Sequence, residues 1–229
     1  MLIAGIDEAG RGPCFGPMTM SIVVIEKKQE VELREMGVKD SKDILPNKRD
    51  TLFSKVKSAT IEHKIKIISP IEINDLMARE NLNEIEAIKI AELINSLKTK
   101  PDIIYVDSPD ATKGKFEKRI RKYLNNNKQN LNILAENKAD SKYVVVGAAS
   151  ILAKVTRDRE IEKMRKEFGD FGSGYPSDPK TKKYLEEYFT TKGKLPPFSR
   201  IFWSTCKRYV DTTNPQQQKL FWTEKFKYV

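Results

Sequence analysis

Hydrophobic residues fall into short continuous runs and into longer runs with helical spacing. Apolar runs over residues 2–6 and 17–25 predict two strands, and the second is so continuous that a buried place in a sheet is expected. Alternating β-branched residues over 59–68 predict a third strand. Shorter runs at 103–106 and just before Asp140 predict two more.

Helical periodicity occurs between and after these strands. It predicts helices over about 47–57, after Pro46, over 83–97 and over the basic segment 113–123. A long helix is predicted over 144–168, with shorter helices beyond it. Strands followed by alternating strands and helices are typical of an α/β fold with a mixed central sheet flanked by helices.

No internal repeat and no low-complexity linker divides the 229 residues. We therefore expect one domain over residues 1–209, in which residues from about 178 to 209 form a helical C-terminal region. Residues 210–229 are expected to form a tail that is itself helical.

Basic residues exceed acidic residues over the whole chain. Lysine and arginine number 42 against 32 aspartates and glutamates, which gives a formal net charge of +10 and an isoelectric point near 9.4. Such a balance favours polyanionic partners, nucleic acid before an anionic membrane. Surface lysine retained for solubility is the alternative, so charge alone assigns no function.

Several chemistries lack the residues that they need. Cys14 and Cys206 are the only cysteines and form no CxxC motif, so neither a zinc site nor a disulfide framework is expected. The chain has no signal-peptide pattern and no apolar run near the ~20 residues of a membrane span, so a cytoplasmic protein with reduced thiols is expected. His63 is the single histidine, which excludes RNA cleavage by a histidine pair. The chain has no GxxxxGKS/T phosphate-binding loop and no GxSxG motif of serine hydrolases. Of the chemistries considered, metal-assisted hydrolysis is the one that these absences do not exclude.

Carboxylates stand where the short predicted strands end: Asp7 with Glu8, Asp107, and Asp140. Because neighbouring side chains of a strand point to opposite faces, we expect the first strand to break at Ala9-Gly10, so that Asp7 and Glu8 converge. Gathered carboxylates repel one another unless a cation lies between them, and Mg²⁺ or Mn²⁺ suits an all-oxygen site. Two such ions about 4 Å apart can hold the attacking and departing oxygens of a phosphodiester. Helix caps and turn acids are the alternative interpretation of each residue taken singly.

Six motifs, in this order and spacing, make the chain resemble ribonuclease HII, and its archaeal members most. They are "GIDEAGRGP", "DSK", "YVDSPD", "NKAD", "AASILAKVTRD" and "GSGYPSDP", and the resemblance covers residues 1 to about 209. It implies the ribonuclease H fold and hydrolysis of the RNA strand of RNA–DNA hybrids. It also implies incision 5′ to a ribonucleotide embedded in duplex DNA, which leaves 3′-hydroxyl and 5′-phosphate ends. Implied roles are the removal of misincorporated ribonucleotides and of RNA primers in DNA replication and repair.

The resemblance assigns the family's four catalytic and metal-binding acids to Asp7, Glu8, Asp107 and Asp140. It implies that they hold Mg²⁺ or Mn²⁺, in a two-ion site. Asp110 competes with Asp107 for the third position, and we prefer Asp107 because the family's acid follows directly on its strand.

Recognition of the sugar is implied for the loop Gly10, Arg11 and Gly12, whose backbone contacts the ribose 2′-hydroxyl in the family. Glycine allows this approach because a Cβ would intrude. A tight turn with a surface arginine is the alternative. Tyr175 is implied to pack on the sugar beside the ribonucleotide, whereas Asp178-Pro179 is interpreted as the start of the next helix.

Phosphate contacts are implied for Ser41 and Lys42 and, on the long helix, for Lys154 and Arg157. The last two share a polar face with Ser150, which could instead be a solvated face. Eight basic and three acidic residues lie between 178 and 209, and their difference of five is half of the net charge of +10 on the whole chain. We therefore expect this helical region to hold the duplex backbone. The basic residues counted there are Lys180, Lys182, Lys183, Lys192, Lys194, Arg200, Lys207 and Arg208.

The tail departs from the clamp-binding box of many archaeal homologues. Gln217 and Leu220 fit that box, but Thr223 and Glu224 occupy its aromatic positions. We favour packing of the tail on the domain, leave binding to the sliding clamp open, and expect a monomer.

Two other hypotheses for the function are a hybrid-binding module without turnover, which the four intact acids argue against, and a transposase or resolvase, which would act on DNA alone.

Overall fold

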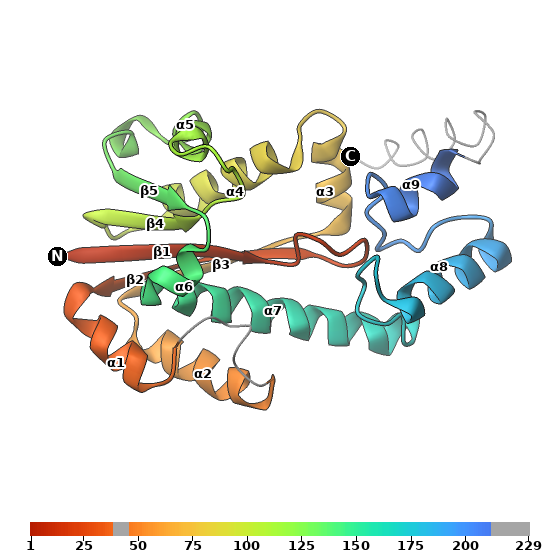
Figure 1. Ribbon diagram of the computed structural model, residues 1–229, viewed down its shortest axis with the longest axis horizontal. Helices are drawn as coiled ribbons and strands as arrows, with labels where there is room; N and C mark the ends of the chain where they lie inside the picture. Colours follow the sequence, from red (N-terminus) through yellow and green to blue (C-terminus); the bar gives the residue numbers. More distant parts are fainter. Residues whose placement is uncertain (39–45, 212–229) are drawn as a thin grey trace.

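The computed structural model describes residues 1–38 and 46–211. Within these ranges five strands form one sheet in the order β3-β2-β1-β4-β5 (Figure 1). β1, β4 and β5 run parallel, whereas β2 and β3 are antiparallel to their neighbours. This mixed sheet confirms the predicted fold class. The strands are β1 Leu2–Ala9, β2 Met18–Glu26, β3 Glu62–Ile68, β4 Ile103–Asp107 and β5 Asn132–Glu136.

Helices cover both faces of the sheet (Figure 1). α3, α4 and α5 bury one face and α1, α2 and α7 bury the other, each with its own hydrophobic cluster. α8 and α9 lie beyond one end of the sheet. The α-helices are α1 Glu30–Glu35, α2 Pro46–Ala59, α3 Pro70–Met77, α4 Leu82–Ser96, α5 Lys115–Arg121, α6 Ala139–Lys142, α7 Val144–Phe168, α8 Pro179–Lys192 and α9 Ser204–Asp211, with short 3-10 helices η1 Lys27–Gln29 and η3 Asn126–Lys128.

The predicted boundaries differ from the observed ones mainly where helix and strand propensities compete. α7 spans the predicted 144–168. The third strand begins at Glu62 rather than at residue 59, because α2 continues through Ala59. α5 begins at Lys115 rather than at residue 113, because Gly114 before it is left-handed, with φ of 78°.

α7 lies unusually close to β1 and β2. A Cβ added to Gly5 of β1 would lie 2.4 Å from the Val145 carbonyl carbon of α7. Two β2 hydroxyls donate to α7 carbonyls: Thr19 Oγ1 to Ala153 at 2.7 Å and Ser21 Oγ to Ala149 at 2.6 Å. Glycine and short hydroxyl side chains therefore let the helix backbone rest directly on the sheet.

The C-terminal helical region packs on the loop between β1 and β2. Cys14 and Phe15 of that loop belong to one buried cluster with Phe171, Leu185 and other residues from the end of α7 onward. The Asp178 side chain accepts from the Lys180 N–H at the start of α8, and Pro179 occupies the first turn, as the sequence predicts. Over the described residues, no helix is both long and apolar enough to span a bilayer.

Replacing Gly5 by alanine should destabilise the protein, because the new Cβ would collide with the α7 backbone. We expect the free energy of unfolding to fall by about 1–3 kcal/mol, as in other overpacked cores, measured by urea denaturation. Gly193 at the end of α8 is the control: it is left-handed with open space around it, so Gly193→Asn should change stability by less than about 1 kcal/mol. Equal stability of Gly5→Ala and wild type would contradict the close packing.

Candidate active site

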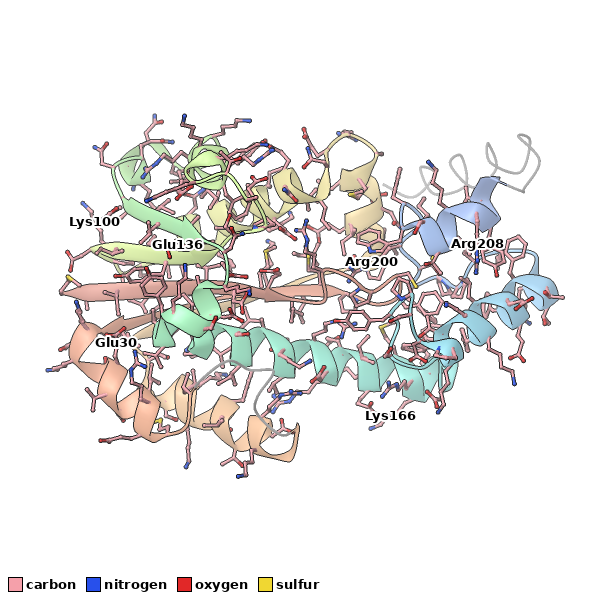
Figure 2. All side chains as sticks on the ribbon, in the orientation of Figure 1. Glu30, Lys100, Glu136, Lys166, Arg200 and Arg208 are labelled. Carbon is pink, nitrogen blue, oxygen red and sulfur yellow. The ribbon has the colours of Figure 1, made fainter. Side chains whose placement is uncertain are left out.

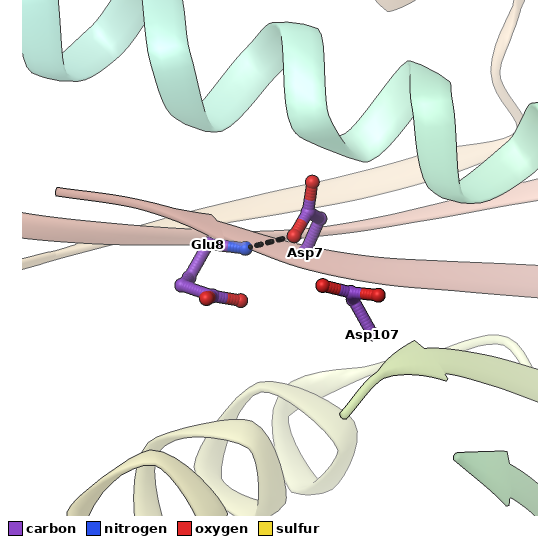
Figure 3. Close-up of side chains that lie close together, drawn as sticks. All are labelled: Asp7, Glu8 and Asp107. Carbon is purple, nitrogen blue, oxygen red and sulfur yellow. Dashed lines mark hydrogen bonds between the residues drawn. The ribbon is translucent and has the colours of Figure 1, made fainter. Parts of the chain in front are cut away.

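Three carboxylates meet where β1 and β4 end. Each of Asp7, Glu8 and Asp107 offers one oxygen, and these oxygens all lie within 4.8 Å of one another (Figure 3). β1 and β4 are parallel neighbours, so their carboxyl ends lie at the same edge of the sheet. The first strand and the fourth thus place their terminal acids together.

β1 ends at Ala9, just before Gly10, as expected. The expectation that a break in the strand makes Asp7 and Glu8 converge is wrong, because both residues remain paired with β2. Their side chains point to opposite faces, Asp7 toward α7 and Glu8 toward α4 (Figure 3). β4 pairs with β1 only as far as Ile6, so the edge of β1 at Asp7 and Glu8 has no neighbouring strand on that side in the described part of the chain. The two side chains approach one another past this unpaired edge. Beyond that point the Glu8 N–H donates to Asp7 Oδ1 at 2.8 Å.

Asp107, and not Asp110, belongs to the group. Asp107 Oδ1 accepts from the Ala139 N–H at 2.7 Å. Asp110 turns away, and its carboxylate accepts from Asn83 at 2.9 Å and from Arg119 at 3.1 Å. Asp140 is buried beside Ala139 at the start of α6 but is not one of the three acids that meet.

Burial and crowding disfavour ionisation of these acids. The pKa of Asp7 is raised well above its usual value by desolvation and by the neighbouring Glu8, although a hydrogen bond with Ser150 of α7 opposes the rise. Desolvation and the charge of Asp107 raise the pKa of Glu8, against the opposing effect of Arg11. One buried and two half-buried carboxylates that repel one another are the donor set that a hard divalent cation would neutralise, so the residues present fit such an ion.

The loop Gly10, Arg11 and Gly12 follows the acids directly. Gly10 is left-handed, with φ of 86°, and a Cβ there would lie 2.3 Å from Arg157 Nε. The Arg11 side chain does not lie free on the surface: it forms an ion pair with buried Glu86 and donates to Asn83 Oδ1 at 2.7 Å. These contacts hold the Arg11 side chain on α4.

Arg200 and Trp203 hold the carbonyl groups of the same loop. Arg200 donates to the Gly16 carbonyl at 2.9 Å and to the Arg11 carbonyl at 3.2 Å, and Trp203 Nε1 donates to the Gly12 carbonyl at 3.2 Å. Arg200 is fully buried, and burial lowers its pKa to about 9. Arg200 is one of the eight basic residues counted in the region expected to hold the duplex backbone, and its charge instead supports a loop inside the protein.

Tyr175 lies beside this loop. Its Cε1 would be 3.3 Å from a Cβ on Gly12, and its ring is 41% exposed. The Gly174 carbonyl accepts from the Cys14 N–H at 2.8 Å, which ties the tyrosine's loop to the chain after Gly12. An exposed aromatic face, the glycine loop and the acids therefore lie in sequence on one surface.

Basic side chains continue this surface along α7. Arg157 is buried next to Tyr175, with its guanidinium 5.8 Å from the ring centre, and burial lowers its pKa. Lys154 Nζ lies 3.7 Å from Asp158, and burial also lowers the pKa of this lysine. An open cavity of about 600 Å³ is lined by Arg49, Lys154, Arg157, Arg159, Arg165 and Lys166 among others. Ser41 and Lys42, predicted to contact phosphate, lie outside the described residues.

Sequence reasoning missed two polar side chains of α4 at this site, Asn83 and Glu86. Glu86 is only 1% exposed, and burial together with the charge of Glu8 raises its pKa to about 8. In the sequence it stands three residues before Lys89, a spacing typical of an exposed ion pair. No pattern within the helix indicates that Glu86 turns inward to meet an arginine 75 residues earlier.

The sheet order, with acids at the ends of adjacent parallel strands beside a basic groove, defines a nuclease of the ribonuclease H class. The family model "Ribonuclease HII" matches residues 4–206. Ribonuclease HII of Pyrococcus furiosus is 47% identical over 227 residues, 99% of each chain. The chain belongs to the ribonuclease HII family.

Solved structures agree with this assignment. The crystal structure of ribonuclease H2 from Pyrococcus horikoshii superposes with a TM-score of 0.85 at 46% identity, covering 92% of this chain and 98% of that one. Archaeoglobus fulgidus RNase HII, solved in a complex with PCNA, superposes with a TM-score of 0.80 at 40% identity, covering 89% and 96%. The protein is thus a ribonuclease H, a divalent-metal-dependent hydrolase acting on RNA–DNA hybrids.

Metal binding should be visible in thermal stability. We expect Asp7→Asn to raise the melting temperature in EDTA, because it removes a charge from a crowded buried group, and to abolish the rise that Mn²⁺ produces in wild type. Asp107→Asn should also abolish the Mn²⁺ response. Asp110→Asn is the matched control: it should lower the melting temperature, by weakening the ion pair with Arg119, and should retain the Mn²⁺ response. A full response in Asp7→Asn would contradict this site.

Proposed function

We propose that this ribonuclease H cuts duplex DNA on the 5′ side of a single embedded ribonucleotide and leaves 3′-hydroxyl and 5′-phosphate ends. The observation that supports it is that Tyr175 lies next to Gly12, with its Cε1 3.3 Å from where a Cβ on that glycine would stand, and that Gly12 follows shortly after Asp7 and Glu8, two of the three acids that meet. One 2′-hydroxyl placed between loop and tyrosine would put the adjacent phosphodiester at the acids. The enzyme would then remove misincorporated ribonucleotides and RNA primers.

In this proposal Asp7, Glu8 and Asp107 hold two Mg²⁺ or Mn²⁺ ions, and Asp140 completes the set. Bound there, the ions would activate water and stabilise the departing oxygen. Ser150 of α7 orients the Asp7 carboxylate by its hydrogen bond. Asp107 is held by the Ala139 N–H, which links it to the segment that carries Asp140.

Lys154 and Arg157 would bind the phosphates that lead away from the cut. Nε and Nη2 of Arg157 are buried and have no hydrogen-bond partner among the described residues. A buried guanidinium without hydrogen-bond partners destabilises the folded protein unless an anion accepts its N–H groups, and the geometry of arginine matches that of phosphate oxygens. Lys154 lines the same cavity about one helical turn nearer to Ser150.

The protein would bind the duplex as a monomer. A complex with PCNA is known for the Archaeoglobus fulgidus relative, but Gln217 and the rest of the tail lie outside the described residues. Because that tail matches the clamp-binding box only in part, we propose that incision itself does not depend on the clamp.

A DNA duplex with one ribonucleotide should be cut once, 5′ to the ribose, in the presence of Mg²⁺. We would compare it on sequencing gels with an all-DNA duplex and a long hybrid. Cutting of the long hybrid alone would remove the single-ribose proposal and leave the hybrid nuclease intact. Gly12→Val should lower cleavage of both substrates, because its side chain would meet Tyr175, whereas Tyr175→Ala should lower cleavage at the single ribose most.

Lys154→Ala should weaken binding to every duplex alike. We expect the slope of log K against log salt concentration to become shallower by about one, the contribution of one phosphate contact. Lys100→Ala is the matched control, because Lys100 precedes β4 and lies at the end of the sheet far from Arg200 (Figure 2). An unchanged slope in Lys154→Ala would show that this lysine is only solvated.

A further inference from the structure

Asn83, in the first turn of α4, bridges the two loops that carry the site. Its Oδ1 accepts from Arg11 Nη2 at 2.7 Å, and its Nδ2 donates to Asp110 Oδ1 at 2.9 Å. Arg11 lies in the loop after β1, and Asp110 lies three residues after Asp107 in the loop after β4. Both ends of one amide are thus used, and each end holds a different loop.

The orientation of this amide is dictated by its neighbours. A guanidinium can only donate and an ionised carboxylate can only accept, so the amide must present its oxygen to Arg11 and its nitrogen to Asp110. Rotation of the amide by half a turn would set donor against donor and acceptor against acceptor. The Asn83 amide can therefore make both of its hydrogen bonds only when the Arg11 loop and the Asp110 loop occupy these positions together.

Further bonds make each loop rigid around this bridge. Arg11 is also paired with Glu86, one turn along α4. Asp110 is also paired with Arg119, and its backbone carbonyl accepts from Ser108 Oγ at 3.2 Å. Asn137, of the segment that leads to Asp140, donates to the Ser108 carbonyl at 2.6 Å.

We propose that Asn83 is a positioning residue, which sets the distance between the ribose-contacting loop, residues 10–12, and the carboxylate of Asp107. The proposal rests on the proposed function of that loop and of the acids. Asn83 touches neither substrate nor metal in this role. It holds the sugar and the scissile phosphate in register with the acids, and a misplacement of about 1 Å can lower a rate by about 100-fold.

Asn83→Ala should lower kcat on the single-ribose duplex by about 10-fold or more, with KM changed less than about 2-fold, because phosphate contacts to the duplex remain. Asn95→Ala is the matched control. Asn95 lies on the same helix, and its amide also makes two bonds, to the Tyr123 carbonyl at 2.9 Å and from the Asn125 N–H at 3.0 Å, away from the acids. It should lose similar thermal stability and keep wild-type kcat.

Exchanging the two polar groups gives the decisive measurement. Asn83→Asp alone sets two carboxylates against each other and should be at least as impaired as Asn83→Ala. The double variant Asn83→Asp with Asp110→Asn restores a donor opposite an acceptor and should recover most of the lost kcat. No recovery, or an equal loss of kcat in Asn95→Ala, would overturn the positioning role.

Wild type and Asp107→Asn belong in the same series, because they test the proposed function itself. If wild type fails to cut the single-ribose duplex, the proposed function fails, and Asn83 is then measured on the long hybrid. If wild type cuts and Asp107→Asn does not, while Asn83→Ala cuts at the wild-type rate, only the inference about Asn83 fails.

Discussion

The close packing of α7 on β1 is the constraint on which the site depends. A side chain on Gly5 would collide with the helix backbone, and the buried hydroxyls of Thr19 and Ser21 find their acceptors in α7 carbonyls. With this contact fixed, successive turns of α7 deliver Ser150 to Asp7 and Arg157 to Gly10. One helix therefore brings together the Asp7 carboxylate, the glycine loop and the basic side chains that line the cavity.

The acids gather without distorting the strand that carries two of them. Asp7 and Glu8 use the two faces of β1 and meet around an edge that β4 has already left. This arrangement leaves three crowded carboxylates in mutual repulsion, which the backbone N–H groups of Glu8 and Ala139 relieve in part. A bound divalent cation would neutralise the rest of this repulsion. The charge of the cation would then serve both the hydrolysis of the substrate and the local stability of the site.

Local patterns in the sequence were sufficient for the fold class and for the bounds of α7, and motif resemblance named the three acids that the structure brings together, Asp7, Glu8 and Asp107. Local patterns failed where the outcome depends on contacts distant in sequence. Asp7 and Glu8 converge without a break between them, because the pairing of β1 with β2 continues to Ala9 and Thr19. Arg200 looked like a surface cation in a basic region but is buried against loop carbonyls. Asn83 and Glu86 are polar residues of a type usually exposed on a helix, and their contacts with Arg11, more than 70 residues earlier, could not be predicted from the helix alone.

The bonds from Arg200 also have a consequence for the order in which the protein can become competent. The carbonyls of Arg11 and Gly16 accept hydrogen bonds from Arg200, which lies 189 and 184 residues further along the chain. During synthesis the acids of β1 and β4, and the bonds from α4 to Arg11, can form before residue 200 is made, whereas the bonds from Arg200 and Trp203 to the loop carbonyls form only after it. A nascent chain would therefore bring its acids together before the backbone of the glycine loop is fully supported, and that support would be the last part of the site to form.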